Sequence, residues 1–428
     1  MKKVLIITYY WPPAGGPGVQ RVLKFAKYLP EFGWQPIILT VQNGEYPAHD
    51  ESLFSDIPNE CIVYKTPAIE PFSLYKKFTG MDADEAIPVA TLTEKKKSWK
   101  KKLAHWIRLN LFIPDAKIGW IPYAVKAGKH IIRNEKPDII FSSSPPPTVH
   151  LIAKSLARWS RIKWMADFRD PWTEIHYYHQ IRSKLSRNLD CFLEQSILSS
   201  CVKATCVSKE FSKILSENDN SKFVIIPNGY DGIELHVQKH QTNFFDIIHV
   251  GGINRSRYYP AFFRSIANLT QSKFDNKKIR LLFIGKIEHS IKEDIIRDCA
   301  GLSKVEFLGY LPHHQATKYM CQASILLIFL EDVDNYEGHI PGKLFEYLVT
   351  GNYILGIGSE KGEAAEILSK TKAGRIFNKD DQYKIDDAII TQYKNWEKGV
   401  KHHSDYEHIK QFSRRTLTEK LVETFTHL

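Results

Sequence analysis

Lys343 and Glu346 stand three residues apart at the start of a short predicted helix, which Pro341-Gly342 precede and Gly351 follows. Proline suits a helix start because its missing N–H group would have no partner there, and glycine suits a helix end. The spacing places Lys343 and Glu346 on one face, with the lysine in the first turn, where free backbone N–H groups favour an anion. Such a helix start could bind a nucleoside diphosphate, with the lysine at the phosphates and the carboxylate at the ribose. A surface ion pair would have the same spacing.

Two short apolar runs flank this helix and predict the fold around it. Residues 325–330 and 353–357 have the length and composition of buried strands, so the segment is typical of a βαβ unit in a parallel sheet. In such a sheet, ligands bind where the carboxyl ends of strands meet the starts of helices. The sequence therefore places Lys343 at an expected ligand site.

A glycine-rich loop near the N-terminus is a second candidate for binding phosphate. Gly15 and Gly16 follow the apolar strand predicted at 4–8, and glycines let the backbone approach a phosphate closely. The loop does not have the GxGxxG pattern, and no acidic residue ends the next strand, at 36–41, where a dinucleotide site needs one. A nicotinamide cofactor is therefore disfavoured, and an ordinary tight turn is the alternative.

Two further residues are candidates for acceptor chemistry. Asp170 follows the strand predicted at 164–166, and its carboxylate could orient or deprotonate a hydroxyl group. The alternative is a structural ion-pair network of Asp167, Arg169 and Asp170. His150 lies near a predicted helix start, where a functional and a buried structural histidine are equally compatible with the sequence.

Alternation of apolar runs and helical patterns predicts an α/β protein with two Rossmann-like domains. We expect the first at residues 1–231, a polar linker at 232–244, and the second at 245–405. Residues 406–428 are expected to form one long amphipathic helix that packs back toward the first domain.

The order and spacing of several motifs resemble the GT-B glycosyltransferases of the GT4-like, retaining class, found in bacterial polysaccharide and cell-surface glycan assembly. The resemblance covers nearly the whole chain. Its motifs are Tyr10-Trp11-Pro12-Pro13 with Gly15-Gly16, Ser143-Ser144-Pro145-Pro146 with His150, Asp167-Phe168-Arg169-Asp170-Pro171-Trp172, Asn228-Gly229-Tyr230-Asp231, Gly251-Gly252 with Arg257, Gly309 with Pro312-His313, and Pro341-Gly342-Lys343 to Glu346.

The resemblance implies two domains facing across a cleft, with the acceptor on the first and the sugar nucleotide on the second. Glu346 would bind the ribose, and Arg257 and Lys343 would neutralise the diphosphate, with Arg255 as a second candidate cation. The candidate catalytic residues are Arg257, Lys343, Asp170 and His150, and the candidate donor-binding residues are Gly15, Gly16, Gly252, Gly342, Glu346 and Glu337. The donor would be UDP- or GDP-linked, and neither a metal nor another cofactor is implied.

The chain departs from the family pattern at one position. The family often has two glutamates separated by seven residues, and the first would fall at Gly338. Either the neighbouring Glu337 replaces it, or the backbone and His339 contact the sugar instead.

The net charge of +11 is concentrated in one segment. Residues 95–113 contain six lysines and an arginine without an acidic residue, and tryptophans lie on the apolar face. Lysines and tryptophans on one amphipathic helix favour an anionic membrane surface, here through Lys95–Arg108. A helix that docks its tryptophans on the domain core is the alternative. Nucleic acid is disfavoured because no nucleic-acid-binding fold accompanies the charge.

Other features bound the location and the chemistry. No apolar run reaches the ~18 residues of a membrane-spanning helix, and the six scattered cysteines fit a reducing cytosol. His176 and His179 have no evident third partner for a metal. The prediction is therefore a cytoplasmic enzyme, peripheral on the inner face of the membrane, that transfers sugar to a glycan or lipid-linked acceptor. A sugar-nucleotide epimerase of the same architecture and a non-catalytic membrane-associated binding protein are the alternatives.

Overall fold

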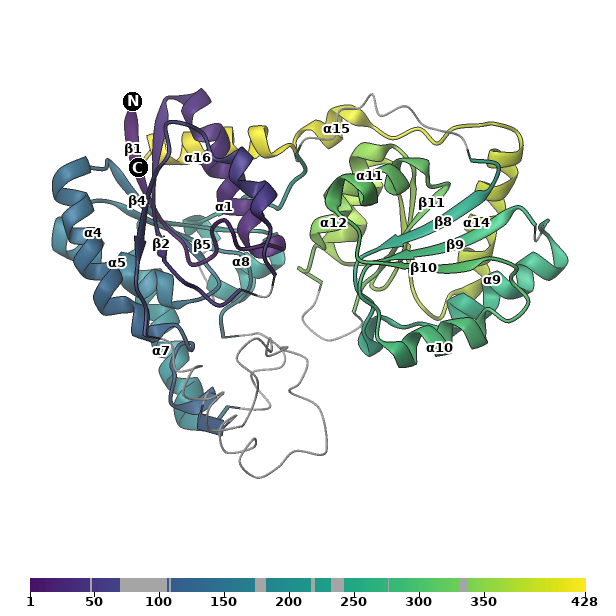
Figure 1. Ribbon diagram of the computed structural model, residues 1–428, viewed down its shortest axis with the longest axis horizontal. Coiled ribbons are helices and arrows are strands. Elements are labelled where there is room, and N and C mark those ends of the chain that lie inside the picture. Colours follow the sequence, from purple (N-terminus) through teal and green to yellow (C-terminus); the bar gives the residue numbers. More distant parts are fainter. Residues whose placement is uncertain are drawn as a thin grey trace. The chain divides into compact units, whose positions relative to one another are not determined.

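The computed structural model describes residues 1–46, 48–69, 106–107, 109–173, 182–216, 220–231, 242–275, 277–331 and 337–428. It divides into two compact units, each with a parallel sheet and helices (Figure 1). Unit 1 contains Met1–Pro227 together with Arg414–Leu428, and unit 2 contains Asn228–Ser413. The division falls four residues before the predicted end of the first domain at 231. Most of the predicted linker, 232–244, lies outside the described residues.

Unit 1 is built on a seven-stranded parallel sheet in the order β3-β2-β1-β4-β5-β6-β7. Its strands are β1 (Lys2–Ile7), β2 (Trp34–Val41), β3 (Ile62–Thr66), β4 (Ile139–Ser144), β5 (Trp164–Phe168), β6 (Lys203–Cys206) and β7 (Phe223–Ile225). Five of the seven were expected, whereas β3 and β7 were not. The residues of β7 and most of β3 are only partly buried, so these strands lack a continuous apolar run.

Helices cover both faces of this sheet, because its strands alternate their apolar side chains between two cores. Leu5 and Ile7 belong to one core, and Val4 and Ile6 to the other. The helical elements are α1 (Pro17–Tyr28), η1 (Leu29–Phe32), η2 (Glu51–Asp56), η4 (Ile118–Trp120), α4 (Ile121–Glu135), α5 (Thr148–Ser160), α7 (Lys184–Ser200), α8 (Lys209–Ser216), η5 (Asn220–Lys222) and α16 (Arg414–Thr426).

Unit 2 repeats the plan with a six-stranded parallel sheet in the order β10-β9-β8-β11-β12-β13. Its strands are β8 (Phe245–Val250), β9 (Ile279–Ile284), β10 (Val305–Gly309), β11 (Ile325–Phe329), β12 (Tyr353–Ile357) and β13 (Gly374–Phe377). Its helices are η6 (Arg255–Arg257), α9 (Pro260–Ser272), α10 (His289–Asp298), α11 (His313–Gln322), α12 (Gly342–Thr350), α13 (Glu363–Thr371), α14 (Gln382–Glu397) and α15 (Tyr406–Lys410). The two parallel α/β units confirm the predicted fold class.

The C-terminal segment returns to unit 1, but not as the single helix that was expected. Ser413 forms a β-bridge with Tyr230, which requires extended backbone and separates α15 from α16. Ile409 of α15 packs in a core of unit 2. In α16, the Phe425 ring lies 5.3 Å from the ring of Trp34, between centroids, inside unit 1.

Candidate functional site

The order of the strands in unit 2 reverses between β8 and β11, and this is where parallel sheets open to bind ligands. The backbones of β8 and β11 pair only at Ile247 with Ile325 and at Ile248 with Leu326. Beyond this point two side chains bond to the Leu327 carbonyl, which accepts from His249 Nδ1 at 3.0 Å and from the Tyr347 hydroxyl at 3.4 Å. The sheet therefore opens at the carboxyl end of β8.

Helix α12 begins beside this opening. Pro341 is its N-cap and Gly351, with φ of 66°, ends it, so the predicted start is right within one residue and the predicted stop is right. The Tyr347 hydroxyl accepts a hydrogen bond from Val250 N–H at 2.8 Å, which ties α12 to the end of β8. Leu344 and Leu348 are completely buried. The helix start is thus fixed by packing on both sides.

Lys343 points from the first turn of α12 toward the end of β8. Its Nζ lies 3.2 Å from His249 Nε2. Gly251 has φ of 120°, a conformation that favours glycine, and a Cβ there would lie 3.3 Å from Lys343 Nζ. Burial, with a further contribution from the Arg257 charge, lowers the pKa of Lys343 to about 7. The Lys343 side chain thus contacts His249, although it is three residues from Glu346 on the same helix.

Arg257 is the second cation near this point. Its Nε lies 3.0 Å from Glu331 Oε1, just beyond β11, and its charge contributes to the lowered pKa of Lys343 and of His249, after burial. Arg255, the other candidate, is well exposed and pairs with Asp294 of α10 at 2.6 Å. The geometry therefore favours Arg257 over Arg255 as the partner of Lys343.

Glu346 lies one turn further along α12, and its Oε1 is 3.1 Å from His313 Nε2 at the start of α11. This contact joins the start of α11 to α12 through two residues of the sequence motifs, His313 and Glu346. Gly342, the first residue of α12, is exposed. Gly252 is also exposed, and a Cβ there would lie 3.1 Å from the Lys286 carbonyl oxygen.

Residues 337–339 surround Gly338, the position at which the chain departs from the family pattern. Glu337 is exposed, and its backbone carbonyl accepts from Glu363 N–H at the start of α13 at 2.9 Å. Gly338 is buried. Burial, and then the charge of Arg257, lower the pKa of His339 to about 4. His339 therefore lies close to the Arg257 guanidinium, which is compatible with the alternative in which His339 replaces the missing glutamate.

The glycine loop of unit 1 packs against the residues that follow β2. Gly15 N–H donates to the Ala48 carbonyl at 2.8 Å, and a Cβ on Gly15 would lie 3.3 Å from Ala48 and Asp50. Gly16 has φ of 86° and precedes α1. An ordinary tight turn, one of the two interpretations of the sequence, thus explains both glycines. Their role in binding phosphate stays a prediction.

Asp167 is fully buried and belongs to an ion pair that the sequence did not predict. Arg21 Nη2 of α1 donates to its Oδ1 at 2.8 Å, and the hydroxyls of Ser143 and Thr205 each donate to it at 2.6 Å. Burial alone would raise its pKa, but Arg21 and these hydrogen bonds hold the pKa of Asp167 below its ordinary value. The structural network that was the alternative to a functional Asp170 thus includes Arg21 as the ion-pair partner of Asp167, which the sequence did not indicate.

Arg169 and Asp170 follow β5. The Arg169 guanidinium donates to the carbonyls of Ser144 at 3.0 Å and of Pro145 at 3.3 Å, and also to that of Gly18. It thus ties α1 to the loop after β4. Asp170 is exposed at the end of β5, and its role toward an acceptor stays a prediction.

His150 lies in α5 and is completely buried. Its Nδ1 lies 2.8 Å from Ser142 Oγ, and its ring centroid is 4.6 Å from that of Phe168. Its Nε2 has no hydrogen-bond partner among the described residues. Burial lowers the pKa of His150 to about 3, so the imidazole is neutral at pH 7. His150 is therefore buried but not fully hydrogen-bonded among the described residues, and a catalytic role for it stays a prediction.

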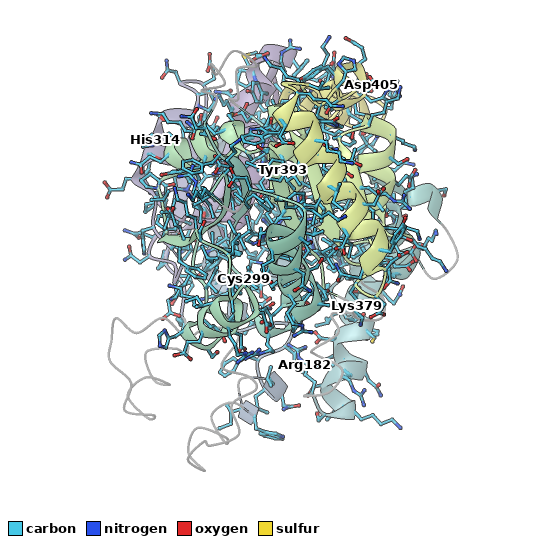
Figure 2. The ribbon with its side chains drawn as sticks, turned by 90° about the vertical axis from the view of Figure 1, so that its right-hand side faces the viewer. Arg182, Cys299, His314, Lys379, Tyr393 and Asp405 are labelled. Atoms are coloured by element: carbon cyan, nitrogen blue, oxygen red, sulfur yellow. The ribbon has the colours of Figure 1, made fainter. Side chains whose placement is uncertain are left out.

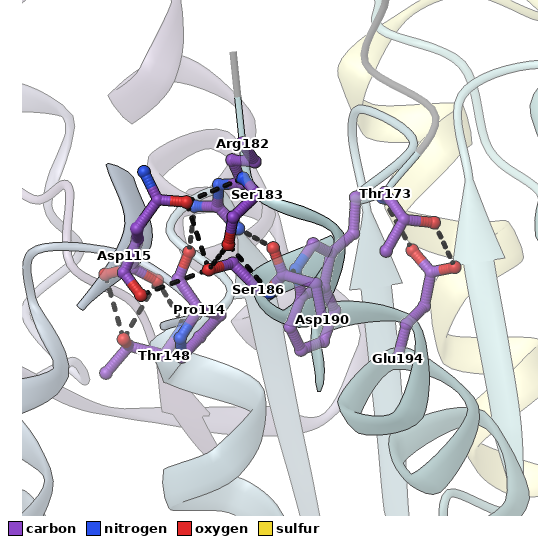
Figure 3. Close-up of polar contacts among 11 residues, drawn as sticks. Pro114, Asp115, Thr148, Thr173, Arg182, Ser183, Ser186, Asp190 and Glu194 are labelled. Carbon is purple, nitrogen blue, oxygen red and sulfur yellow. Dashed lines mark hydrogen bonds and ion pairs between the residues drawn. The ribbon is translucent and has the colours of Figure 1, made fainter. Parts of the chain in front are cut away.

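Figure 3 shows a polar network that fixes the segment before α4 to α5 and α7. Asp115 accepts from Thr148 N–H at 2.8 Å. Arg182 forms an ion pair with Asp190 and donates to the Pro114 carbonyl at 2.8 Å. The buried face of α7 is therefore polar in its first part, at Ser186, Asp190 and Glu194, and apolar in its last part, at Ile197 and Leu198.

The predicted membrane-binding segment, Lys95–Arg108, lies outside the described residues except for Trp106 and Ile107, as do His176 and His179. Among the described residues, no group of three or more His, Cys, Asp or Glu side chains could hold a metal ion. In the same part of the chain, no helix is both long and apolar enough to cross a membrane. Figure 2 shows the side chains of the described residues as sticks.

Comparison with solved structures identifies the architecture as GT-B. Sucrose-phosphate synthase from Thermosynechococcus elongatus aligns over 100% of this chain and 99% of its own, at 13% identity and a TM-score of 0.63. HepE from Anabaena in complex with UDP and glucose aligns over 100% of both chains, at 12% identity and a TM-score of 0.61. WaaG, a glycosyltransferase involved in lipopolysaccharide biosynthesis, aligns over 99% of both chains, at 10% identity and a TM-score of 0.57.

Two family models match the sequence. Residues 16–232 match Glycosyltransferase Family 4, and residues 245–395 match Glycosyl transferases group 1. The chain therefore belongs to glycosyltransferase family 4, and the resemblance inferred from its motifs is confirmed. No curated protein sequence matches the chain.

Proposed function

We propose that the protein is a retaining glycosyltransferase that moves a sugar from a UDP- or GDP-linked donor to a glycan or lipid-linked acceptor in cell-surface polysaccharide biosynthesis. The observation that supports this best is the approach of Lys343 and Arg257 to the open end of β8. Among the described residues, neither cation pairs with a buried carboxylate: Lys343 contacts a neutral histidine, and Glu331, the partner of Arg257, is partly exposed. HepE, which has the same fold, was solved with UDP and glucose.

The chemistry needs positive charge at this position. As the glycosidic bond breaks, negative charge develops on the departing nucleoside diphosphate, and fixed cations stabilise that charge in the transition state. Lys343 and Arg257 would supply it without a metal ion. In a retaining reaction of this kind, the acceptor hydroxyl attacks from the side of the leaving group and its proton passes to a departing phosphate oxygen. We name no protein nucleophile.

Thermal unfolding with UDP, GDP, ADP, dTDP, CMP and NAD, in the presence of EDTA, tests the donor class. One nucleoside diphosphate should raise the melting temperature, because a ligand that binds only the folded state stabilises it. Stabilisation by NAD alone would overturn the proposal. Incubation with the matching sugar nucleotide but no acceptor separates the epimerase alternative, since only an epimerase would change the sugar.

Glu346→Ala tests the assignment of the ribose contact. We expect nucleotide affinity to fall by about ten- to a hundredfold, as for the loss of a hydrogen bond to a charged group, with little change in the melting temperature. Glu293→Ala is the matched control, since Glu293 also pairs with a histidine, His289, on the surface of unit 2. Unchanged affinity in folded Glu346→Ala would exclude the ribose role.

We further propose that unit 1 attaches to an anionic membrane surface. Helix α7 exposes three large apolar side chains: Leu185, Leu189 and Phe192 are 80%, 45% and 68% exposed. Asn110 Oδ1 accepts from Ser183 N–H at 2.7 Å, which links α7 to the segment that contains the exposed Trp106 and Leu111. Exposed apolar side chains beside a strongly basic sequence suit the interface of an anionic bilayer.

Sedimentation with phosphatidylcholine vesicles, with and without phosphatidylglycerol, tests this attachment. The wild type should sediment only with the anionic vesicles. Replacing Leu185, Leu189 and Phe192 by serine should release it, as should replacing Lys100, Lys101 and Lys102 by glutamate. A control with Tyr383→Ser and Val400→Ser, two exposed apolar residues of unit 2, should still bind. Equal binding by the glutamate variant would favour a solvated basic helix instead.

A further inference from the structure

We propose that His249 is a positioning residue for donor binding: its neutral imidazole holds the Lys343 ammonium at the open end of β8 without cancelling its charge. This inference rests on the proposed role of Lys343 at the donor diphosphate. Neither the sequence motifs nor the family pattern indicated His249, because it lies inside an apolar run that predicts an ordinary buried strand.

Two hydrogen bonds fix the state of the His249 ring. A carbonyl oxygen can only accept, so the 3.0 Å contact between Nδ1 and the Leu327 carbonyl places a proton on Nδ1. The neutral ring then has its lone pair on Nε2, and Lys343 Nζ lies 3.2 Å from that atom. Lys343 is thus the donor and His249 the acceptor.

The ring has little freedom to turn away from the lysine. His249 is 1% exposed, and its centroid lies 5.2 Å from that of Phe329 and 6.3 Å from that of Phe283. Gly251 leaves room for the lysine, since a Cβ at this position would lie 3.3 Å from Lys343 Nζ. A buried polar side chain in an apolar layer costs free energy unless it is hydrogen-bonded. The contacts of His249 with the Leu327 carbonyl and with Lys343 offset this cost.

The charged groups around the pair explain why a neutral partner matters. Burial and then the charge of Arg257 lower the pKa of Lys343. Burial, then the charge of Lys343 and, less strongly, that of Arg257 lower the pKa of His249, against hydrogen bonds to the backbone of Leu327 and Gly252. Two carboxylates among the described residues of this region pair with other side chains: Glu331 with Arg257, and Glu346 with His313. His339 also lies near Arg257. A carboxylate in place of His249 would compete with a phosphate for Lys343, whereas an imidazole only orients it.

A second consequence concerns protons. Burial beside a second cation makes Lys343 give up its proton near pH 7 in the free protein, and a bound diphosphate would favour the charged ammonium. Donor binding should therefore take up a proton. Since the pKa of Lys343 rises on binding, affinity should be highest below pH 7 and should fall as the pH increases.

A double-mutant cycle tests the pairing of His249 with Lys343. UDP and GDP are titrated calorimetrically against the wild type, His249→Phe, Lys343→Met and the double variant. We expect His249→Phe to weaken binding roughly tenfold, the loss of one oriented charge contact. In the Lys343→Met background, the same substitution should have little further effect. An equal loss in both backgrounds would overturn the proposal, since it would mean that His249 acts only through the fold.

His249→Gln provides the rescue, because its amide oxygen can accept from Lys343 where the phenylalanine ring cannot. It should restore most of the affinity at a melting temperature similar to that of His249→Phe. Failure of the rescue, with both variants folded, would also contradict the proposal. Absence of binding by the wild type to either nucleotide would instead contradict the proposed function, so the two failures are distinguishable.

Titration from about pH 6 to about pH 8.5, which brackets the pKa of about 7 at Lys343, tests the proton uptake. Wild-type affinity should fall with pH, and the binding heat at pH 7 should depend on the ionisation enthalpy of the buffer. Lys343→Arg, which keeps its charge across this range, should remove both dependences. Retention of both by Lys343→Arg would show that another group takes up the proton.

Discussion

The two sheets differ at the point where their strand order reverses. In unit 1, β1 and β4 pair through Ile7 and Ser142, close to their ends. In unit 2, β8 and β11 stop pairing after Ile248 and Leu326, and side chains occupy the opening. The charges differ in the same sense. Near the reversal in unit 1, Asp167 and Arg21 form an ion pair in which the two charges offset each other. Near the reversal in unit 2, Lys343 contacts the neutral imidazole of His249 instead.

The difference between the two pairs is the difference between a charge that stabilises the fold and a charge that can bind a ligand. A buried ion pair with all its hydrogen bonds made has no remaining capacity for a ligand, and breaking it is costly. A partly buried cation whose acceptor is neutral still has its charge available for an anion. The same fold thus uses one strand end to attach α1 to its sheet, and the other is the strand end at which we propose that the donor diphosphate binds.

The largest effect is expected when Asp167 is replaced by alanine. The change leaves Arg21 charged, buried and unpaired, which should cost about 3–5 kcal/mol of unfolding free energy. Urea denaturation followed by tryptophan fluorescence measures this loss. Arg21→Met with Asp167→Leu should recover much of it, because two apolar side chains need no partner. A small loss in Asp167→Ala would mean that the pair is not structural.

Acid should destabilise unit 1 through His150. Because burial depresses the pKa of His150 to about 3 in the folded state, below the ordinary value of 6.5, its contribution is complete above pH 6.5 and falls as the pH decreases toward 3. The expected loss is about 1.4 kcal/mol per pH unit, or about 2 kcal/mol at pH 5.

Denaturation of His150→Gln and of the wild type at pH 7 and pH 5 measures this contribution. The difference between the two pH values should be smaller in the variant by about 2 kcal/mol, since glutamine does not titrate. The other buried histidines are common to both proteins and cancel. An identical acid dependence would show that His150 is already protonated or exposed at pH 5.

The smallest effect distinguishes the two arginines of η6. Arg257→Gln should weaken nucleotide binding by roughly tenfold, about 1.4 kcal/mol, because Arg257 lies near Lys343. Arg255→Gln should change it less than about twofold, since its exposed pair with Asp294 is screened by solvent. Calorimetric titration of both variants with the nucleotide that stabilises the wild type decides between them. Equal losses would place Arg255 at the site as well.

The sequence predicted the helix that carries Lys343 because its start and stop are chemically marked by Pro341 and Gly351. The expected fold class was right because the central strands are continuous apolar runs. Strands β3, β7 and β13 were missed because they are short or only partly buried. No local pattern distinguishes them from loops.

The side-chain pairings could not be predicted in this way. Asp167 and Arg21 lie 146 positions apart, and only the order of the strands brings them together. His249 and Lys343 are separated by 94 positions, so a histidine within an apolar strand gave no sign of its partner. The break before α16 depends on a bridge from Ser413 to Tyr230, which is likewise a tertiary contact.

The return of α16 to unit 1 has a consequence for synthesis on the ribosome. Leu417, Leu421 and Phe425 complete a core whose other residues include Val4, Val22 and Trp34. The whole of Asn228–Ser413 must be translated between these two parts of the core, which takes on the order of ten seconds or more at ordinary elongation rates. The core of unit 1 therefore cannot be completed until α16 has been translated, after the whole of unit 2.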